Sequence, residues 1–252
     1  SSAPVLAAAD RVPAQTSGEV GLGPGGDPEV NEELQGRAQV VAASPVASVV
    51  YRLIRVFIRV VLWSYFRLGV SGREHLAGDA ALIIAPVHRS NLDSFLLAPL
   101  TRRRFRSLAK ESLFQVRLLA WFIAALGAFP VRRGSADRES LRAARLLLDE
   151  GATLLVFPEG GRQRGDEIGE LFDGAAYLAA RTGAPVVPVG IAGTEEAMAQ
   201  GARLPRPCRV QVVVGPALPP PDPSAKRSAL RAWTADLLAN LQSVQQAARS
   251  RL

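Results

Sequence analysis

The feature of this sequence that most constrains its fold is an alternation of apolar runs and helix-like runs that begins near residue 80. Five short apolar runs have the length and composition of buried strands: 81–85, 128–132, 153–157, 186–191 and 209–214. Helix-like runs alternate with them: 92–100, 112–126, 136–150, 171–182 and 223–247. Strands that are apolar throughout and alternate with helices are typical of parallel sheets covered on both faces. The pattern therefore predicts an α/β fold in which helices flank a mixed, largely parallel sheet.

The chain divides into a tail and one domain. Residues 1–44 are rich in Ala, Pro, Gly and acids and show no helical or strand period, which predicts a disordered tail. They contain no basic start followed by a long apolar run, so we do not expect a secretory signal. Residues 45–252 should form one domain with a first helix, an α/β core, and a Pro-rich linker with a final helix: 45–70, 71–215 and 216–252. Asp222 as N-cap and Pro223 at the first helical position predict where the final helix begins.

The charge of the chain indicates an anionic partner. The formal net charge is +7, and because residues 1–44 hold six acids and two arginines, the remaining residues carry +11. A domain with a net positive charge attracts phospholipid headgroups, nucleic acid or a phosphorylated substrate. Only 6% of the residues are aromatic and no recognised nucleic-acid-binding motif is present, so we do not expect nucleic acid. One cysteine and two histidines exclude a disulfide framework and a Cys or His metal cluster, and we expect neither a metal nor a cofactor.

The first predicted helix, residues 45–70, is apolar except for a narrow basic stripe. Arg52, Arg55 and Arg59 share this stripe, and spanning a bilayer would cost roughly 2.5–3.5 kcal/mol for each of them. A helix lying in the headgroup layer fits better, with these arginines toward phosphates and aromatic side chains such as Trp63 below them. The alternative is a helix packed on the core of its own protein with solvated arginines. The pattern favours an amphipathic helix at a membrane interface.

A second apolar stretch lies at residues 118–131, which carry no charge over fourteen positions. This stretch is too short to span a membrane. Burial in the core is the ordinary interpretation, and a second hydrophobic surface against lipid or an acyl chain is the alternative.

The segment HRSNLD follows the predicted strand 81–85 and contains a candidate catalytic pair. His88 and Asp93 would lie about 140° apart on one helix. They can meet if His88 lies before a helix that Ser90 or Asn91 starts as N-cap, with Asp93 in its first turn. His88 could then take a proton from a hydroxyl while Asp93 holds the ring tautomer. The alternative is that Asp93 only caps the helix, because Ser90 and Asp93 have capping-box spacing.

The segment FPEGGR, residues 157–162, is a candidate binding turn. Gly160 permits positive φ and a close approach of backbone N–H groups to a ligand. Arg162 can bind a phosphate with two parallel hydrogen bonds, and Glu159 can accept hydrogen bonds from hydroxyls. The segment lacks the pattern of a P-loop, so nucleotide hydrolysis has no support. The alternative is a glycine-rich surface turn with a solvated arginine.

A third segment, GAFPVRR at residues 127–133, places Arg132 and Arg133 at the end of a predicted strand. These arginines suggest another anion contact, with surface solvation as the alternative. All three segments end or follow a predicted strand, and ligands gather outside the carboxyl ends of strands in open α/β sheets. We therefore expect the three segments to contribute to one site.

Together these segments resemble the conserved blocks of the glycerolipid acyltransferase family, typified by the 1-acylglycerol-3-phosphate acyltransferases. In chain order the similar segments are HRSNLD (88–93), GAFPVRR (127–133), FPEGGR (157–162) and VVPV (186–189). A further segment, AKESLF, resembles the stretch that such enzymes carry between the first two blocks. A single His-x4-Asp pattern is weak, whereas the ordered set is specific. The resemblance covers roughly residues 46–220.

The resemblance implies a direct acyl transfer. His88, oriented by Asp93, would act as base on a glycerol-type hydroxyl, which attacks the thioester of an acyl-CoA or acyl-carrier protein. No acyl-enzyme is expected, because Ser90 is not part of a GxSxG elbow. The acceptor would be bound by residues of the other blocks. Arg133 and Arg162 would hold its phosphate, Glu159 would contact its hydroxyl region, and Gly160 would let the backbone approach it closely.

The resemblance also implies the substrate and location. The predicted reaction acylates the free hydroxyl of lysophosphatidic acid, giving phosphatidic acid, by a peripheral or monotopic protein on the cytoplasmic face of an anionic membrane. Val87 stands where the family usually has Asn, and Gly161 where it usually has Thr, which leaves the acceptor less determined than the reaction type. The alternatives are acylation of glycerol 3-phosphate or another lysolipid, hydrolysis by the same dyad, and a non-catalytic basic module that binds membranes or nucleic acid.

Overall fold

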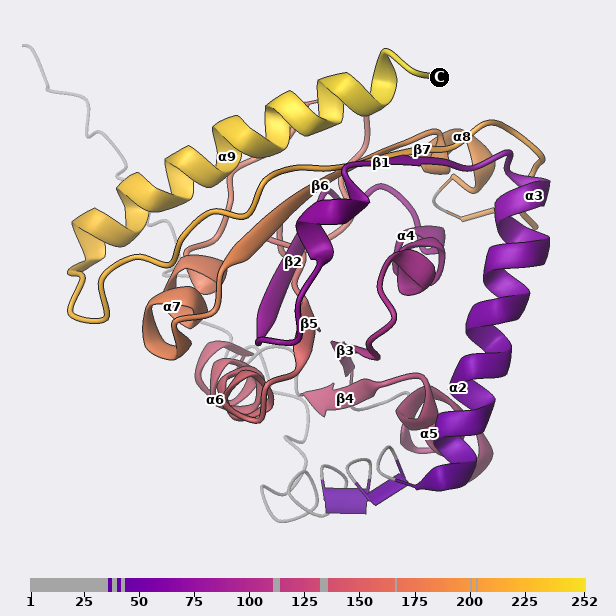
Figure 1. The fold of residues 1–252 in the computed structure, drawn as a ribbon, viewed down its shortest axis with the longest axis horizontal. Helices are drawn as coiled ribbons and strands as arrows, with labels where there is room; N and C mark the ends of the chain where they lie inside the picture. The colour runs from indigo at the N-terminus through magenta and orange to yellow at the C-terminus, as the bar shows by residue number, and fades with distance from the viewer. Residues whose placement is uncertain are drawn as a thin grey trace, which may run out of the picture.

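The computed structural model describes most of the chain from residue 36 onward: 36–37, 40–41, 44–110, 114–131, 136–165, 167–199, 201–202 and 204–252. Almost all of the predicted disordered tail lies outside these residues. The described elements surround a single twisted sheet (Figure 1).

Within the described residues, the sheet has seven strands in the order β1-β7-β6-β2-β5-β3-β4. Their bounds are β1 Gly69–Ser71, β2 Leu82–Pro86, β3 Phe105–Lys110, β4 Ala128–Val131, β5 Thr153–Leu155, β6 Val186–Ala192 and β7 Gln211–Val214. Neighbouring strands are parallel except β6 and β7, which are antiparallel. The mixed, largely parallel α/β sheet predicted from the sequence is therefore confirmed.

Two strands, β1 and β3, were not predicted. β1 is only three residues long and half-buried, so it has no continuous apolar run. β3 contains Arg106 and Ser107 next to Phe105, which breaks the apolar pattern. Both strands are recruited by pairing with neighbours rather than by their own composition, which is the usual limit of strand propensity.

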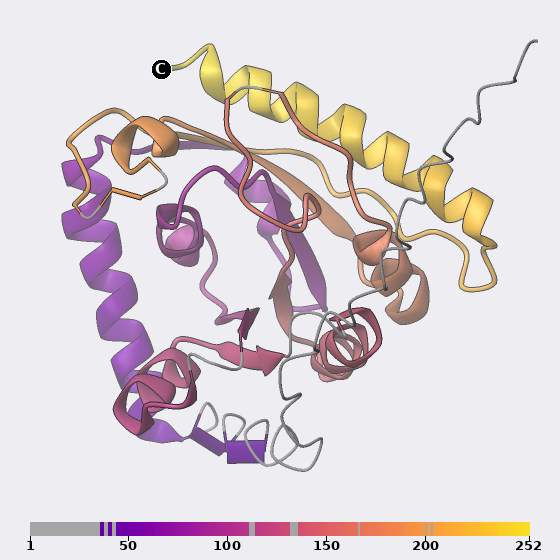
Figure 2. The ribbon, with the colours of Figure 1, turned by 180° about the vertical axis from the view of Figure 1, so that it is seen from behind.

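The helices lie on both sides of the sheet. Their bounds are α2 Pro45–Phe57, η1 Ile58–Leu62, α3 Trp63–Tyr65, η2 Arg73–Leu76, α4 Leu92–Leu97, η3 Ala98–Leu100, α5 Arg117–Ala125, α6 Ala136–Asp149, α7 Gly174–Thr182, α8 Thr194–Ala197 and α9 Arg227–Arg249. Figures 1 and 2 show α9 along one side of the sheet and α4 between the sheet and the long helix α2-η1-α3.

The predicted start of the last helix was wrong. α9 begins at Arg227 rather than at Pro223. The carboxylate of Asp222 accepts the backbone N–H of Ser224 at 2.7 Å, and its carbonyl accepts the N–H of Ala225 at 2.9 Å. Asp222 therefore closes a turn ahead of the helix, the use of Asp that competes with N-capping.

The core lies around the central strands β2 and β6, in which every residue is buried. α9 packs directly on β6 because Gly190 has no side chain: a Cβ there would overlap the carbonyl of Val244 in the helix. Beside it, the buried amide of Gln245 binds both the N–H and the C=O of Ile191, at 2.9 and 3.1 Å. This close seam fixes α9 against β6, next to the antiparallel pair β6–β7.

The long helix along one side of the molecule is α2 continued by the π-helical turn η1 and by α3 (Figure 1). α2 begins as its sequence dictates, with Pro45 at the first helical position and the Ser44 hydroxyl accepting the N–H of Ala47 at 3.1 Å. Ala47, Tyr51 and Ile58 are buried against the protein. Among the described helices, none combines the length and apolar character needed to cross a membrane.

Candidate active site

The predicted pair meets at the carboxyl end of β2. His88 lies in the loop after β2 and Asp93 in the first turn of α4, and the distance between His88 Nδ1 and Asp93 Oδ2 is 2.9 Å. The same carboxylate oxygen accepts the backbone N–H groups of Arg89 and Ser90, at 2.7 and 2.8 Å. The catalytic and capping interpretations are therefore compatible, since Asp93 contacts the ring and closes the helix start.

This arrangement assigns the tautomer of His88. An ionised Asp93 accepts a hydrogen bond, so Nδ1 carries the proton and Nε2 keeps a free lone pair. The His88 side chain is 17% exposed, whereas that of Asp93 is fully buried. A reactant can therefore reach His88 but not the carboxylate behind it, which is the geometry of a general base with an orienting acid.

The His88 ring is also held in its plane by Phe157. The two rings are stacked, with centroids 3.8 Å apart and planes 20° from parallel. Phe157 lies shortly after β5, at the start of the FPEGGR segment. The segments HRSNLD and FPEGGR are thus in direct contact at neighbouring strand ends, as the sequence analysis expected.

Glu159 lies under this site rather than at its surface. The residue is 3% exposed, and the Nη1 group of Arg89 lies 2.8 and 3.0 Å from its two carboxylate oxygens. Its oxygens also accept the N–H of His88 at 3.1 Å and that of Gly169 at 3.3 Å. The structure therefore directs this carboxylate, to which the sequence analysis assigned the acceptor hydroxyl region, toward the protein.

The sequence analysis did not single out Arg89, which is 4% exposed. An arginine leaves no mark in a hydropathy pattern that would distinguish burial from solvation. The available signal was Glu159, which lies four residues after the buried strand β5, because a carboxylate that becomes buried needs a cation close by.

Gly160 and Arg162 lie in the turn that follows Glu159. Gly160 is exposed and has a φ of +68°, and a Cβ there would lie 2.6 Å from the ring of Phe172. This position therefore favours glycine for its backbone conformation, whereas the exposed Phe172 ring could move aside for a Cβ. Arg162 is half-buried, and no hydrogen bond or ion pair joins its guanidinium to the described residues. Arg133, the other predicted phosphate contact, lies outside the described residues.

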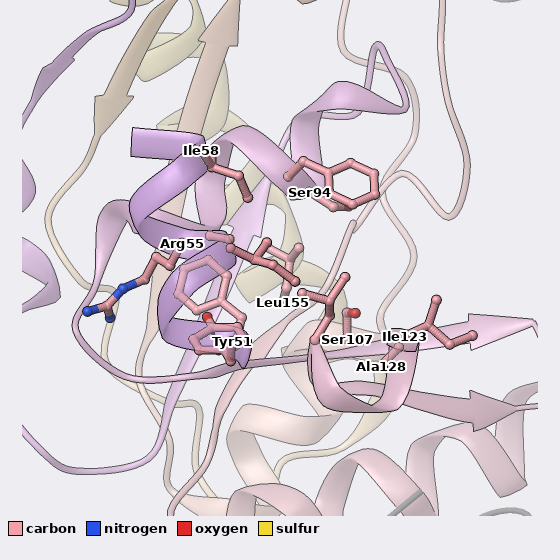
Figure 3. A pocket seen from close by; sticks show the side chains of 13 residues that line it. Tyr51, Arg55, Ile58, Ser94, Ser107, Ile123, Ala128 and Leu155 are labelled. Atoms are coloured by element: carbon pink, nitrogen blue, oxygen red, sulfur yellow. Dashed lines mark hydrogen bonds between the residues drawn. The ribbon is translucent and has the colours of Figure 1, made fainter. Parts of the chain in front are cut away.

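An apolar cavity of about 130 Å³ lies between α2, α4, α5 and strands β3 to β5 (Figure 3). Ser94, which follows Asp93 directly, lines it together with Ile58, Leu155 and Ile123. In Figure 3 the guanidinium of Arg55 points away from the other labelled side chains, leaving a mostly hydrocarbon wall. The sequence analysis did not predict this cavity, although the uncharged stretch 118–131 supplies part of its wall.

The structure divides the predicted interfacial residues into two groups. Arg55 donates to the carbonyls of Thr101 and Arg102, at 3.0 and 2.6 Å, and the indole of Trp63 donates to Leu96 at 3.0 Å. Both side chains therefore bind their own protein. Arg52 and Arg59 are exposed, and the guanidinium of Arg59 lies 5.3 Å from the centre of the Trp63 ring.

The remaining face of the long helix is apolar and exposed. Seven side chains at helical spacing are 45–64% exposed: Val46, Val49, Leu53, Val56, Phe57, Val60 and Val61. We call these seven residues the apolar face. One side of this helix packs on the protein and the opposite side does not, and the membrane-interface interpretation stays a prediction. Contiguous apolar surface of this kind marks an interaction site.

Known proteins with similar sequences are glycerolipid enzymes. The chain is 28% identical over 144 residues to the chloroplast 1-acyl-sn-glycerol-3-phosphate acyltransferase of Arabidopsis thaliana, covering 56% of this chain and 40% of that protein. It is 28% identical over 189 residues to the 1-acyl-sn-glycerol-3-phosphate acyltransferase of Pseudomonas aeruginosa, covering 71% and 72%. The chain thus spans less than half the length of the chloroplast relative.

The fold has a counterpart among solved structures. The crystal structure of the 1-acyl-sn-glycerophosphate acyltransferase PlsC from Thermotoga maritima superposes with a TM-score of 0.66 at 24% identity, covering 86% of this chain and 88% of that one. A model of the family described as Acyltransferase matches residues 67–192. This range, half of the chain, runs from β1 to the end of β6 and includes the dyad, the ion pair behind it and the Gly160 turn. The chain therefore belongs to the acyltransferase family.

Proposed function

We propose that this protein is a membrane-surface O-acyltransferase that transfers a fatty acyl group from an acyl thioester to the free hydroxyl of lysophosphatidic acid. The observation that carries the proposal is the 2.9 Å contact between His88 Nδ1 and the buried Asp93, which leaves Nε2 as the unbound nitrogen of a partly exposed side chain. The similar proteins are named as 1-acyl-sn-glycerol-3-phosphate acyltransferases, which supports the choice of acceptor.

In the proposed reaction, Nε2 of His88 removes the proton of the acceptor hydroxyl as its oxygen attacks the thioester carbonyl. Asp93 stabilises the imidazolium that forms. The tetrahedral intermediate then collapses with loss of the C–S bond, and the thiolate of CoA or acyl-carrier protein takes the proton from His88. The product is phosphatidic acid, and the histidine returns to its starting form without a covalent enzyme intermediate.

The acceptor phosphate is assigned to the turn beside the dyad. Arg162 is supported by its half-buried position and by the lack of a guanidinium partner among the described residues, and Gly160 by its exposed backbone with positive φ. Arg133 stays a proposed contact on the strength of its sequence segment. We assign to Glu159 an indirect part in acceptor binding, because its oxygens are bound within the protein.

The apolar cavity is the proposed place for part of the acyl chain. It begins beside Ser94, one residue from Asp93, and its wall is mostly hydrocarbon. Burial of the chain there would be favourable by roughly 0.8 kcal/mol per methylene. The size of the cavity would therefore influence which acyl chain lengths place the thioester carbonyl near His88.

Membrane association is supported by the apolar face and by the two exposed arginines, Arg52 and Arg59, next to it. An apolar helical face inserts at the boundary of headgroups and acyl chains, and arginines beside it bind anionic headgroups. Since anionic lipids concentrate on the cytoplasmic leaflet, we propose that this leaflet is the one bound.

The proposal is tested by mass-spectrometric identification of the products formed from acyl-CoA, or acyl-carrier protein, and a panel of acceptors. The panel contains lysophosphatidate, other lysophospholipids and glycerol 3-phosphate, with His88→Ala as the control. We expect phosphatidic acid from lysophosphatidate. If only glycerol 3-phosphate is acylated, the acceptor is reassigned. If only free fatty acid is released, the protein is a hydrolase. Turnover by His88→Ala would contradict the mechanism.

A further inference from the structure

A buried ion pair lies directly behind the catalytic loop, between Arg89 and Glu159. Their side chains are 3% and 0% exposed, and Arg89 Nη1 lies 2.8 Å from Glu159 Oε1. Removing two charges from water costs about as much free energy as their attraction returns, so such a pair is a weak source of stability. Its contacts point instead to a role in the site.

The pair binds both polar groups of the His88 backbone. Glu159 Oε1 accepts the N–H of His88 at 3.1 Å, and Nη1 of Arg89 donates to the His88 carbonyl at 3.0 Å. Asp93 and Phe157 fix the ring of His88, while the pair fixes the peptide groups that carry it. The position of the base is thus determined from both its side chain and its backbone.

The same pair anchors the loop that carries the proposed phosphate site. The remaining nitrogens of Arg89 donate to the carbonyls of Gly165 and Glu167, each at 3.0 Å. Directly after the turn 160–162, the N–H of Gln163 donates to the His88 carbonyl at 2.9 Å. The turn 160–162 is therefore held at both ends, by Glu159 before it and by Gln163 after it.

We propose that the Arg89–Glu159 pair is the positioning element that sets the spacing between the base His88 and the phosphate-binding turn 160–162. The acceptor must present its hydroxyl to His88 and its phosphate to Arg162 at the same time, so a change in this spacing misaligns the attack even if each group is intact. A misplacement of about 1 Å in such a site costs on the order of 100-fold in rate. The expected loss of kcat rests on the proposed function. The expected displacement of His88 relative to the turn does not.

Two variants test the pair. Arg89→Lys keeps the charge facing Glu159, but a single ammonium cannot also reach Gly165 and Glu167, so we expect kcat to fall about 10-fold. Arg89→Gln with Glu159→Gln removes both charges together and leaves neither one unpaired, so folding is preserved while kcat with lysophosphatidate falls about 100-fold. The KM for the acyl donor should be unchanged in both variants. The matched control is the exposed pair on α6, Arg145→Gln with Asp149→Asn, whose kcat should equal that of the wild type.

A second readout does not depend on activity. The chain has two histidines, so the ring protons of His75 and His88 are resolved by NMR and assigned with His88→Ala. The stacked Phe157 ring shields the His88 ring protons. In the double variant these signals should move toward the unstacked position, while those of His75, which contacts the Val214 carbonyl, stay in place.

The outcomes separate the two proposals. If the wild type transfers no acyl group to any acceptor, the proposed function fails, and the NMR shift still tests the geometric inference. If the wild type is active but the double variant keeps kcat within threefold of the control, or its His88 signals do not move, the positioning role is rejected. A loss of activity in both variants accompanied by loss of the folded His75 signal would show that the pair serves folding and would also reject it.

Discussion

The dyad loop and the long helix break the ordinary rules of burial in opposite ways. Around His88, charged groups lie in the interior and are bound by hydrogen bonds and one ion pair. Along α2 and η1, large apolar side chains lie in solvent. Proton transfer needs a base held in one place by buried polar groups, whereas association with a lipid surface needs apolar area that the protein itself does not cover. Under the proposed function, chemistry and membrane association belong to separate parts of this chain and should be separable by mutation.

The largest expected effect comes from removing the base. His88→Ala should lower acyl transfer by about 10³-fold or more, because general-base catalysis contributes on the order of 10²–10⁴-fold and the Asp93 contact is lost with it. Binding to anionic vesicles, measured by co-sedimentation, should equal that of the wild type. Residual turnover near the wild-type rate would remove His88 from the mechanism.

The converse variant removes apolar surface and leaves the dyad alone. Leu53→Ser, Phe57→Ser and Val60→Ser together should weaken vesicle partitioning by about 10³-fold, since each buried apolar side chain contributes roughly 1.5 kcal/mol or more. With a water-soluble short-chain acceptor, kcat should be unchanged. The control replaces two exposed leucines outside this helix, Leu146 and Leu204, by Ser. Equal loss of binding in this control would contradict a specific apolar face.

A smaller effect is expected from the exposed arginines. Arg52→Gln with Arg59→Gln should weaken binding to anionic vesicles about 30-fold, at roughly 1 kcal/mol for each residue, and should not affect binding to neutral vesicles. Arg55→Gln should lower the melting temperature instead, because this arginine donates to the Thr101 and Arg102 carbonyls. If Arg55→Gln weakens vesicle binding as strongly as the double variant, our division of the basic stripe is wrong.

The smallest effect concerns the cavity between the two regions. Ser107→Phe would fill space for about two methylenes, each contributing roughly 0.8 kcal/mol, so the preference for long over short acyl-CoA should fall about 10-fold. The maximal rate with a short donor should be unchanged. An unaltered chain-length profile, measured as kcat/KM across donors, would place the acyl chain outside this cavity.

Much of the fold and the dyad could be predicted because their signals are local. The apolar runs near 81–85 and 186–191 mark the central strands, and Ser90-x-x-Asp93 marks a helix start that brings Asp93 back to His88. The strands β1 and β3 could not be predicted in the same way, because their pairing depends on neighbours rather than on their own residues.

The sequence by itself therefore determined the α/β class, the placement of HRSNLD and FPEGGR at strand ends, and the amphipathic character of the first helix, since periodicity and turn residues act over a few positions. Tertiary structure alone decided the partners of polar groups that lie far apart in the sequence. Glu159 pairs with Arg89 across 70 residues, and Arg55 binds carbonyls 46 and 47 residues away. A buried charge takes whichever partner the fold brings within hydrogen-bond distance, and that distance is set only when the strands assemble.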